Sequence, residues 1–323
     1  MIHIASVFDT NYLARALVMY RSLIQYLPDA RFHFLCLDTA AQKTIQKLDL
    51  ANVIATDIAQ MNDPELMATR GSRTPVEFAM SAKPAWIAKL ISSDIIAPGD
   101  QLILVDVDIM FYEDPKPLLA RLASHPISIT PHRFPKSTEA VMSDKVGIYN
   151  SGLIFFTKMG DAVRCAQEWR LQCIKWCSTT YEPGLYTDQR YLNDWHHKYT
   201  GIYDIPDKGV NAGTWNIATF SVQATHDRST SQTRFLINGD PLICYHFHGL
   251  KLYFSQSGKL LAYPITIHHG GIYALHLREL GRAYADLEAL QAGWTFGTAK
   301  NPGILRLIKQ TATRMFRSIM PVS

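Results

Sequence analysis

Asp106 and Asp108 are the two residues whose types and spacing most clearly suit chemistry. They follow the apolar run Leu102–Val105, and side chains two residues apart on an extended segment project to the same side. Two such carboxylates can share one divalent cation, and Mg²⁺ or Mn²⁺ accepts hard oxygen ligands while keeping coordination positions for phosphate oxygens. Solvated turn acids are the alternative, but apolar residues on both sides disfavour it, because burying two like charges without a cation is costly.

A second group of polar residues follows the apolar segment Leu242–Tyr245. It contains His246, His248, Gly249 and Lys251. A neutral imidazole can supply a further metal ligand, a lysine can hold a phosphate as a point charge, and a glycine lets the backbone approach a ligand closely. A purely structural histidine is the alternative, but two histidines around an aromatic residue, followed by Gly and Lys, favour function.

Three polar stretches could recognise a sugar. Residues 149–152 and 187–190 contain Asn, Asp and Gln beside aromatic residues, and sugar hydroxyl groups bind to amides and carboxylates. Turn residues and helix caps, such as an N-cap at Thr187 or Asp188, are the alternative, and spacing alone does not decide. The third stretch holds Trp215 and Asn216, which could line an acceptor site or belong to an ordinary turn.

Strands and helices alternate along the first hundred residues, which predicts a mostly parallel, doubly wound α/β sheet. In such sheets ligands bind at the carboxyl ends of the strands, where Asp106 and Asp108 stand. The predicted helix 77–92 contains a proline and is either continuous or two abutting pieces. We expect strands at 2–8, 31–38, 52–57, 102–105, 126–130 and 148–156, helices at 13–27, 42–48 and 162–176, a polar connection at 64–75, and short strands from 201 to 247.

The bulk composition, 47% hydrophobic and 19% charged residues in 323, is that of an ordinary globular protein. No run reaches the roughly 18 apolar residues of a membrane-spanning helix, and the N-terminus lacks the basic start of a signal peptide. We therefore expect a cytosolic location and reduced thiols for the five cysteines. Residues 301–323 contain four basic and no acidic residues, which equals the net charge of +4, so we expect no nucleic-acid partner.

The order of these motifs resembles the retaining GT-A glycosyltransferases of the glycogenin and lipopolysaccharide-galactosyltransferase group. It is most similar to bacterial glycosyltransferases of surface-polysaccharide synthesis. The resemblance extends over about residues 1–255 and is strongest from 147 to 251. The motifs that carry it are Asp9–Tyr12, Asp106–Asp108, Tyr149–Gly152, Asp188–Gln189, Trp215–Asn216 and His246–Lys251.

The resemblance implies a GT-A fold, which is a Rossmann-like α/β sheet flanked by helices, a UDP-sugar donor, and retention at the anomeric carbon. It implies that Mn²⁺ or Mg²⁺ is held by Asp106, Asp108 and His246, and that Asp188 and Gln189 lie at the reacting face. Donor contacts are implied for Asp9, Tyr12, Lys83, Asp106, Val107, Asn150, Ser151, Asp188, Gln189, Gly249 and Lys251, and acceptor contacts for Trp215, Asn216 and His248.

The sequence departs from the group at two places. Lys251 lies one position nearer to the preceding glycine than in the group. The group's arginine in the helix before the Asp106 strand is absent, and Lys83 could take its place without the bidentate guanidinium.

We predict a catalytic domain at 1–260 and an extension at 261–323. Within the extension, residues 302–320 place apolar side chains on one helical face and Arg306, Lys309, Arg314 and Arg317 on the remainder. A basic amphipathic helix suits an anionic membrane surface, and packing on protein is the alternative. We therefore expect transfer of a hexose to a saccharide, lipid-linked and on the way to lipopolysaccharide or another surface polysaccharide, at the inner face of the cell membrane.

Two other functions fit parts of the pattern. A metal-dependent nucleotidyltransferase or other phosphoryl-transfer enzyme predicts a glycine-rich phosphate loop after the first strand, but Phe8–Tyr12 contains no glycine. An inactive carbohydrate-binding module predicts lost metal ligands, but all three are present.

Overall fold

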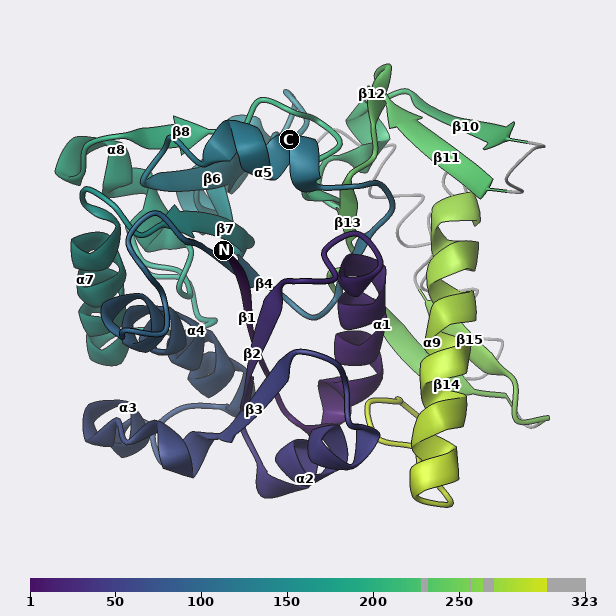
Figure 1. The fold of residues 1–323 in the computed structure, drawn as a ribbon. Helices are drawn as coiled ribbons and strands as arrows, with labels where there is room; N and C mark the ends of the chain where they lie inside the picture. The colour runs from purple at the N-terminus through teal and green to yellow at the C-terminus, as the bar shows by residue number, and fades with distance from the viewer. Residues whose placement is uncertain (228–231, 256, 264–269, 301–323) are drawn as a thin grey trace. The chain divides into compact units, whose positions relative to one another are not determined.

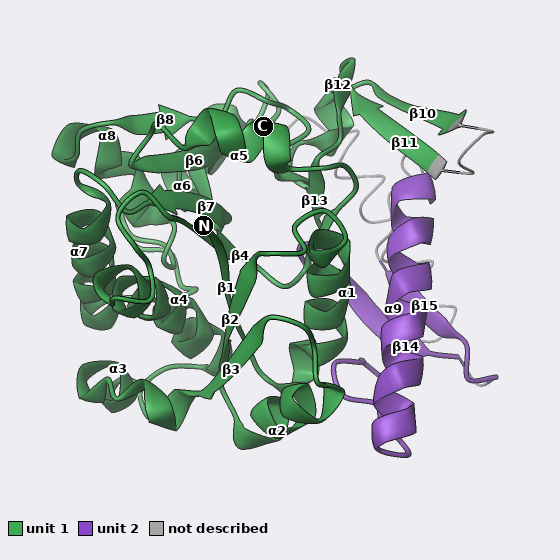
Figure 2. Ribbon diagram, viewed as in Figure 1, with its two compact units in different colours: residues 1–247 green, residues 248–323 purple. Residues whose placement is uncertain are grey.

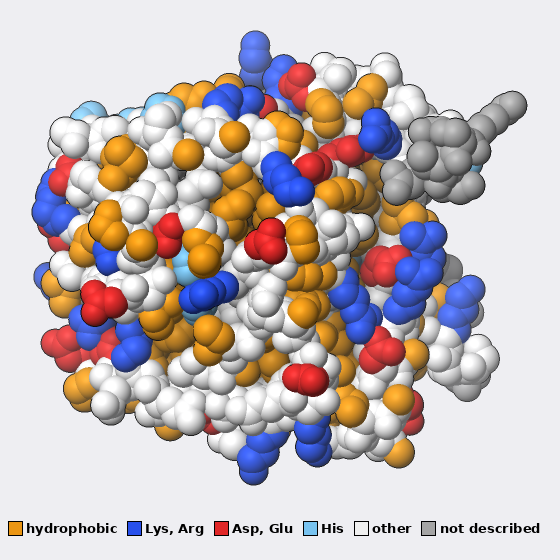
Figure 3. Space-filling view, viewed as in Figure 1, with side chains coloured by type: hydrophobic (Ala, Val, Ile, Leu, Met, Phe, Trp, Pro, Cys, Tyr) orange, Lys and Arg blue, Asp and Glu red, His pale blue; other side chains and the backbone are white. Residues whose placement is uncertain are grey.

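The computed structural model describes residues 1–227, 232–255, 257–263 and 270–300 (Figure 1). The chain divides into two compact units, Met1–Phe247 and His248–Ser323, which are coloured green and purple in Figure 2. The predicted domain boundary at residue 260 stays a prediction. On the face in Figure 3, acidic and basic side chains are interspersed among apolar ones.

Unit 1 is built on a seven-stranded sheet with the order β3-β2-β1-β4-β7-β6-β8 (Figure 1). Strands β3, β2, β1 and β4 are parallel, and β7 runs antiparallel to its neighbours β4 and β6. This confirms the predicted α/β class with a mostly parallel central sheet. The strands are β1 (Ile2–Phe8), β2 (Arg31–Cys36), β3 (Val53–Asp57), β4 (Gln101–Val105), β6 (Ile127–Pro131), β7 (Tyr149–Thr157) and β8 (Ile202–Asp204).

Strands β4 and β7 are buried along their whole length, which explains their continuous apolar runs. Helices cover both faces of the sheet: α4 (Pro75–Ser92) packs against α7 (Ala162–Lys175), and α1 (Leu13–Ile24) lies on the opposite side (Figure 1). The core beside α7 contains the fully buried Trp169 and Trp195, whose rings meet edge to face. The carboxyl ends of β1 and β4 therefore belong to a sheet that helices cover on both faces.

Helix ends follow local sequence signals. Thr74 and Glu77 form a capping box with Pro75 in the first turn of α4, and Asp38 caps α2 (Thr39–Leu48). Pro84 lies inside α4, which is one continuous helix rather than two pieces. The predicted polar connection at 64–75 is wrong in part, because Asp63 caps the short helix α3 (Pro64–Ala68).

A small sheet connects distant parts of unit 1. Strand β13 (Cys244–His246) pairs with β5 (Ile109–Phe111) on one side and with β9 (Ala212–Gly213) on the other. His246 stands opposite Ile109, the residue after Asp108. This pairing brings the second polar group of the sequence to the first.

The register of β6 against β7 shifts at one point. Ile129 stands opposite Ile154, whereas Thr130 stands opposite Asn150. Residues 151–153 therefore bulge out of the β6 ladder. The remaining elements of unit 1 are η1 (Thr10–Tyr12), η2 (Ile58–Met61), α5 (Lys116–Leu122), α6 (Glu139–Val146), η3 (Arg190–Asp194), α8 (Trp195–Lys198), η4 (Ile217–Thr219), β10 (Val222–Asp227), β11 (Gln232–Ile237) and β12 (Asp240–Pro241).

Unit 2 contains the hairpin β14 (Lys251–Phe254) and β15 (Leu260–Tyr263) and the helix α9 (Gly270–Leu290). The buried face of α9 includes Tyr273 and Leu280. The predicted amphipathic helix at 302–320 lies outside the described residues. Among the helices that the structure describes, none combines the length and apolar character needed to cross a bilayer.

The Glu77 carboxylate joins the start of α4 to the segment that follows α7. One oxygen accepts hydrogen bonds from the backbone and hydroxyl of Thr74, at 3.0 and 2.9 Å. The other accepts from the Ser178 hydroxyl and the Thr179 backbone, both at 2.8 Å, and from the Thr179 hydroxyl at 3.1 Å. These donors lower the pKa of Glu77 from 4.5 to about 2. The clamp fixes the chain shortly before Asp188.

Replacing Glu77 by glutamine should lower the free energy of unfolding at neutral pH, because the amide NH₂ would face N–H and O–H donors. A folded-state pKa of about 2 against 4.5 corresponds to about 3 kcal/mol, which is present above pH 4.5 and is lost as the pH falls toward 2. Urea unfolding at a series of pH values measures both effects. The variant should lack this acid-dependent loss.

Glu65→Gln is the matched control. Its side chain is 60% exposed and pairs with Arg170 at the surface, so we expect a change below about 1 kcal/mol. Equal effects of the two substitutions would contradict the clamp.

Candidate functional site

Asp106 and Asp108 stand at the carboxyl end of β4, which neighbouring strands hold in place. The Asp106 N–H donates to the Gly152 carbonyl at 2.7 Å, and the Ser6 hydroxyl donates to the Val105 carbonyl at 2.7 Å. The Ile109 N–H donates to the Asp106 carbonyl at 3.0 Å, so residues 106–109 form a turn. The expectation of an extended segment is wrong here. The turn also buries Val107, which is 5% exposed.

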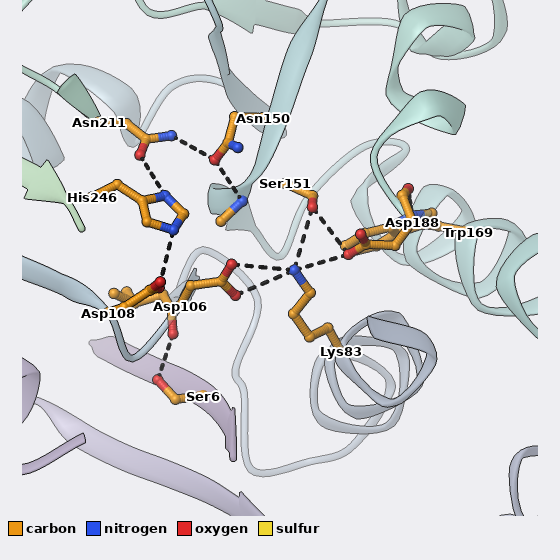
Figure 4. Close-up of polar contacts among 12 residues, drawn as sticks. Ser6, Lys83, Asp106, Asp108, Asn150, Ser151, Trp169, Asp188, Asn211 and His246 are labelled. Carbon is orange, nitrogen blue, oxygen red and sulfur yellow. Dashed lines mark hydrogen bonds and ion pairs between the residues drawn. The ribbon is translucent and has the colours of Figure 1, made fainter. Parts of the chain in front are cut away.

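His246 meets Asp108 at this turn. Its Nε2 lies 3.0 Å from Oδ1 of Asp108, and the Phe247 N–H donates to the Asp108 carbonyl (Figure 4). The imidazole is 3% exposed. Burial alone would lower the pKa of His246, but the Asp108 and Asp106 carboxylates raise it above its usual value. The predicted ligands Asp108 and His246 are thus in contact.

Gly152 of β7 lets the backbone approach Asp106 and His246 closely. A Cβ atom on this glycine would lie 2.5 Å from Cε1 of His246 and 2.9 Å from Oδ2 of Asp106. Asp108 and His246 supply the hard oxygen and nitrogen ligands that Mn²⁺ accepts, and these two residues fit a divalent cation. Among the described residues, Asp106 does not join their group of close ligand atoms, because both of its carboxylate oxygens face the Lys83 ammonium.

Lys83 of α4 connects Asp106 to Asp188. Its Nζ lies 3.2 and 3.3 Å from the Asp106 oxygens and 2.9 Å from Oδ2 of Asp188 (Figure 4). The lysine is 7% exposed and Asp188 is 1% exposed. Burial alone would lower the pKa of Lys83, but the two carboxylates raise it above its usual value, so the ammonium stays charged.

The segment that carries Asp188 and Gln189 is fixed from several sides. The Trp169 indole donates to the Asp188 carbonyl at 2.8 Å, and the Ser151 hydroxyl donates to the Asp188 carboxylate at 3.0 Å. Gln189 donates to the Val146 carbonyl at 2.9 Å. Helix η3 has Gln189 at its N-cap without a side-chain cap bond, so the alternative of Asp188 as a helix cap is wrong.

Asp9 and Tyr12 lie in the turn after β1. Asp9 accepts from the Asn11 N–H at 3.0 Å, and Tyr12 is 44% exposed with the Arg15 guanidinium 4.9 Å from its ring centroid. Asp38 accepts from the Thr10 N–H at 2.9 Å and ties this turn to the end of β2. Asp38 was not predicted from the sequence, although an acid at the end of a neighbouring parallel strand indicates a position at the same edge of the sheet. Tyr12 offers an aromatic face beside the acidic site.

The predicted acceptor residues differ in their contacts and in the unit to which they belong. The Trp215 ring centroid is 5.2 Å from that of His246, and the two rings meet edge to face. Asn216 is buried, and its Nδ2 donates to the His132 carbonyl at 2.8 Å, so its amide holds the loop. His248, Gly249 and Lys251 belong to unit 2, in which Gly249 has a φ of +73°.

The sequence profile described as "Glycosyl transferase family 8" matches residues 3–198, more than half of the chain. This chain belongs to glycosyl transferase family 8. The predicted family group is confirmed, and the nucleotidyltransferase alternative is wrong. Metal use and the roles of individual site residues remain predictions.

Individual relatives extend the similarity along the chain. The uncharacterized protein YfnD of Bacillus subtilis (strain 168) is 27% identical over 265 residues, 81% of this chain and 82% of YfnD. The crystal structure of the galactosyltransferase LgtC with donor and acceptor sugar analogs has a TM-score of 0.52 and 19% identity, over 88% of this chain and 95% of LgtC. An active-site mutant of LgtC gives 0.54 and 18%, over 87% and 95%. The likeness to LgtC confirms the GT-A fold.

Gly152→Ala should weaken Mn²⁺ binding more than about 10-fold, because the new methyl group would occupy the space between His246 and Asp106. Isothermal titration calorimetry with Mn²⁺ measures the affinity, and circular dichroism checks the fold.

Gly71→Ala is the control, since a Cβ atom at that position meets no heavy atom within 4 Å. If both variants bound Mn²⁺ as the wild type does, the cation site could not lie beside Gly152.

Proposed function

We propose that this family 8 enzyme transfers a hexose from a UDP-sugar to a saccharide acceptor with retention of anomeric configuration, with Mn²⁺ or Mg²⁺ bound at Asp106, Asp108 and His246. The observation that carries the proposal is the contact of Asp108 with His246, which Gly152 approaches closely. The galactosyltransferase LgtC, crystallised with donor and acceptor sugar analogs, supports the substrate class.

The cation, when bound, supplies positive charge that offsets the negative charge of the leaving nucleoside diphosphate. The Tyr12 side chain is 44% exposed with the Arg15 guanidinium 4.9 Å from its ring centroid, and in this proposal the ring stacks on the nucleobase. Asp9 lies in the same turn. Because this turn follows β1 and the acids follow β4, its neighbour in the sheet, base and diphosphate would bind along one edge.

The Lys83 ammonium keeps the acidic site neutral enough to receive an anionic donor. It lies within 3.3 Å of both Asp106 and Asp188, so part of their negative charge is compensated before any cation binds. Gln189 is held by the Val146 carbonyl through its NH₂ group, and its carbonyl oxygen is oriented by that bond. In this proposal Asp188 and Gln189 face the donor sugar.

Asp108→Asn is expected to reduce UDP release from a UDP-sugar by about 100-fold or more, because it removes a charged cation ligand while preserving size. The assay follows UDP release from a panel of UDP-sugars, with Mn²⁺ and with a chelator. Asp114→Asn serves as control, since Asp114 lies outside the site and accepts from the Lys116 N–H at the surface.

Donor turnover that ignores both the chelator and the Asp108 substitution would exclude the metal-dependent mechanism. A wild type that binds sugars without turnover of any donor would favour the inactive carbohydrate-binding module.

The acceptor is, in our proposal, lipid-linked and part of lipopolysaccharide or another surface polysaccharide, and the enzyme works at the inner face of the cell membrane. Support comes from the sequence of residues 302–320, in which basic residues alternate with apolar ones. Such a segment gains about 1 kcal/mol per basic residue at an anionic surface.

Changing Arg306, Lys309, Arg314 and Arg317 together to glutamate in the full-length chain should abolish co-sedimentation with vesicles that contain anionic phospholipid. The Lys43→Glu, Lys47→Glu variant, altered on the exposed side of α2, should still bind. Vesicles of neutral phospholipid give the baseline. Equal co-sedimentation of all three proteins would contradict the membrane role.

A further inference from the structure

A buried polar network behind His246 contains Asn211, which is not one of the predicted site residues. Asn211, 1% exposed, has Oδ1 3.2 Å from Nδ1 of His246. Its Nδ2 donates to Oδ1 of Asn150 at 3.0 Å (Figure 4). The same Nδ2 donates to the Thr130 hydroxyl at 2.7 Å. Asn211 thus lies on the far side of the imidazole from Asp108.

Backbone groups fix the direction of every hydrogen bond at Asn150. The Gly152 N–H can only donate, and it donates to Oδ1 of Asn150 at 2.9 Å. That identifies the carbonyl side of the Asn150 amide, so Nδ2 is the group that faces Nε2 of His132 at 3.4 Å. His132 in turn has Nδ1 3.0 Å from the Gly147 carbonyl, which can only accept. The Asn150 oxygen is therefore an acceptor toward Asn211 as well.

The amide of Asn211 is oriented by the same reasoning. Its Nδ2 faces two acceptors, the Asn150 oxygen and the Thr130 hydroxyl, which donates its own proton to the Leu153 carbonyl at 3.5 Å. The other end, Oδ1, is then a pure acceptor directed at Nδ1 of His246. A hydrogen bond there requires the proton of the neutral imidazole to be on Nδ1. The Asp108 carboxylate lies 3.0 Å from Nε2 and competes for that proton, so the tautomer of the metal-free protein reports which of the two acceptors holds it.

We propose that Asn211 is a positioning residue that fixes the Nδ1–H tautomer of His246 and thereby presents the Nε2 lone pair to a divalent cation beside Asp108. The inference rests on the proposed metal site. The hydrogen-bond partner of the second ring nitrogen sets the tautomer and ring orientation of a metal-ligating histidine, and loss of that partner typically weakens metal binding by about 10- to 100-fold.

Backbone pairing on either side of Asn211 holds its amide next to His246. Ala212 pairs with Tyr245 in the β9–β13 ladder, and the Asn211 N–H donates to Sγ of Cys244 at 3.2 Å. Asn211 has a φ of +55°, a conformation that asparagine and glycine adopt most readily. Asparagine alone of these two carries an amide that reaches the imidazole.

The network also gives Asn150 a different role from the predicted donor contact. Its oxygen accepts from Gly152 and Asn211, and its NH₂ group faces His132. Asn150 is 9% exposed. Its amide therefore anchors Asn211 to the β7 backbone at Gly152.

The tautomer of His246 can be measured without any substitution. In ¹⁵N-labelled, metal-free wild-type protein at alkaline pH, long-range ¹H–¹⁵N correlation spectra distinguish a protonated from an unprotonated ring nitrogen. We expect the His246 signals of an Nδ1–H imidazole. An Nε2–H imidazole would overturn the proposal, whatever the protein binds.

Asn211→Gly tests the consequence for metal binding, because it removes the amide and tolerates the positive φ. We expect Mn²⁺ affinity, measured by calorimetry, to fall about 10- to 100-fold, and the His246 signals to shift toward a mixture of tautomers. Asn238→Gly is the matched control: Asn238 also has a positive φ, +52°, and its side chain only accepts from the Ser221 N–H at the surface.

The outcomes separate the two proposals. If the wild type binds no divalent cation, the proposed metal site fails. If the wild type and a folded Asn211→Gly bind Mn²⁺ equally, the site stands and Asn211 has no positioning role. Should Asn211→Gly fail to fold, the wild-type tautomer still decides.

Discussion

The buried ammonium of Lys83 is the interaction on which the site depends. It brings together three segments that are distant in the sequence: helix α4, the end of β4 at Asp106, and the loop that carries Asp188. Asp188 is buried and the Asp106 side chain is 26% exposed, and the two carboxylates would repel each other without the ammonium that they share. Removal of any one of these three charged side chains would leave uncompensated charge in the interior. Substitutions that change their charge or length are therefore expected to destabilise the protein. Lysine reaches both carboxylates as a point charge, where an arginine would have to align its planar group.

Around this ion pair, the protein uses backbone groups to fix side chains that have more than one possible orientation. Asn150 and Asn211 could each be placed with oxygen and nitrogen exchanged, but the Gly152 N–H and the Leu153 carbonyl allow only one arrangement. The Glu77 clamp acts similarly on the segment before Asp188. Side chains in such sites lose little freedom when a ligand binds, because folding has already ordered them.

The sequence allowed prediction of the parts whose signals are local. The apolar run of β4 and the acids after it gave the strand and the position of the site. The helix predicted at 77–92 starts two residues after the observed start of α4, because the capping box of Thr74 and Glu77 was not recognised in the sequence. The turn at Asp106–Ile109 was missed, since its backbone bonds depend on Gly152 of another strand. The Asn211–His246 contact arises from the β9–β13 pairing, and no local pattern near either residue indicates a partner so distant in sequence. Lys83 was predicted only through the resemblance, because a lysine inside an apolar helix gives no sign of its two carboxylate partners.

The bulge at residues 151–153 has a consequence for how the chain finds its fold. A regular antiparallel pair can slide by two residues and keep the same side chains on the same face. Strand β7 cannot do so against β6, because only one alignment puts the three extra residues beside Asp106 and leaves Thr130 opposite Asn150. The irregularity that brings Gly152 against Asp106 and His246 therefore also fixes the register of β6 and β7. A misaligned pair would lose backbone hydrogen bonds and would not persist as a near-native competitor.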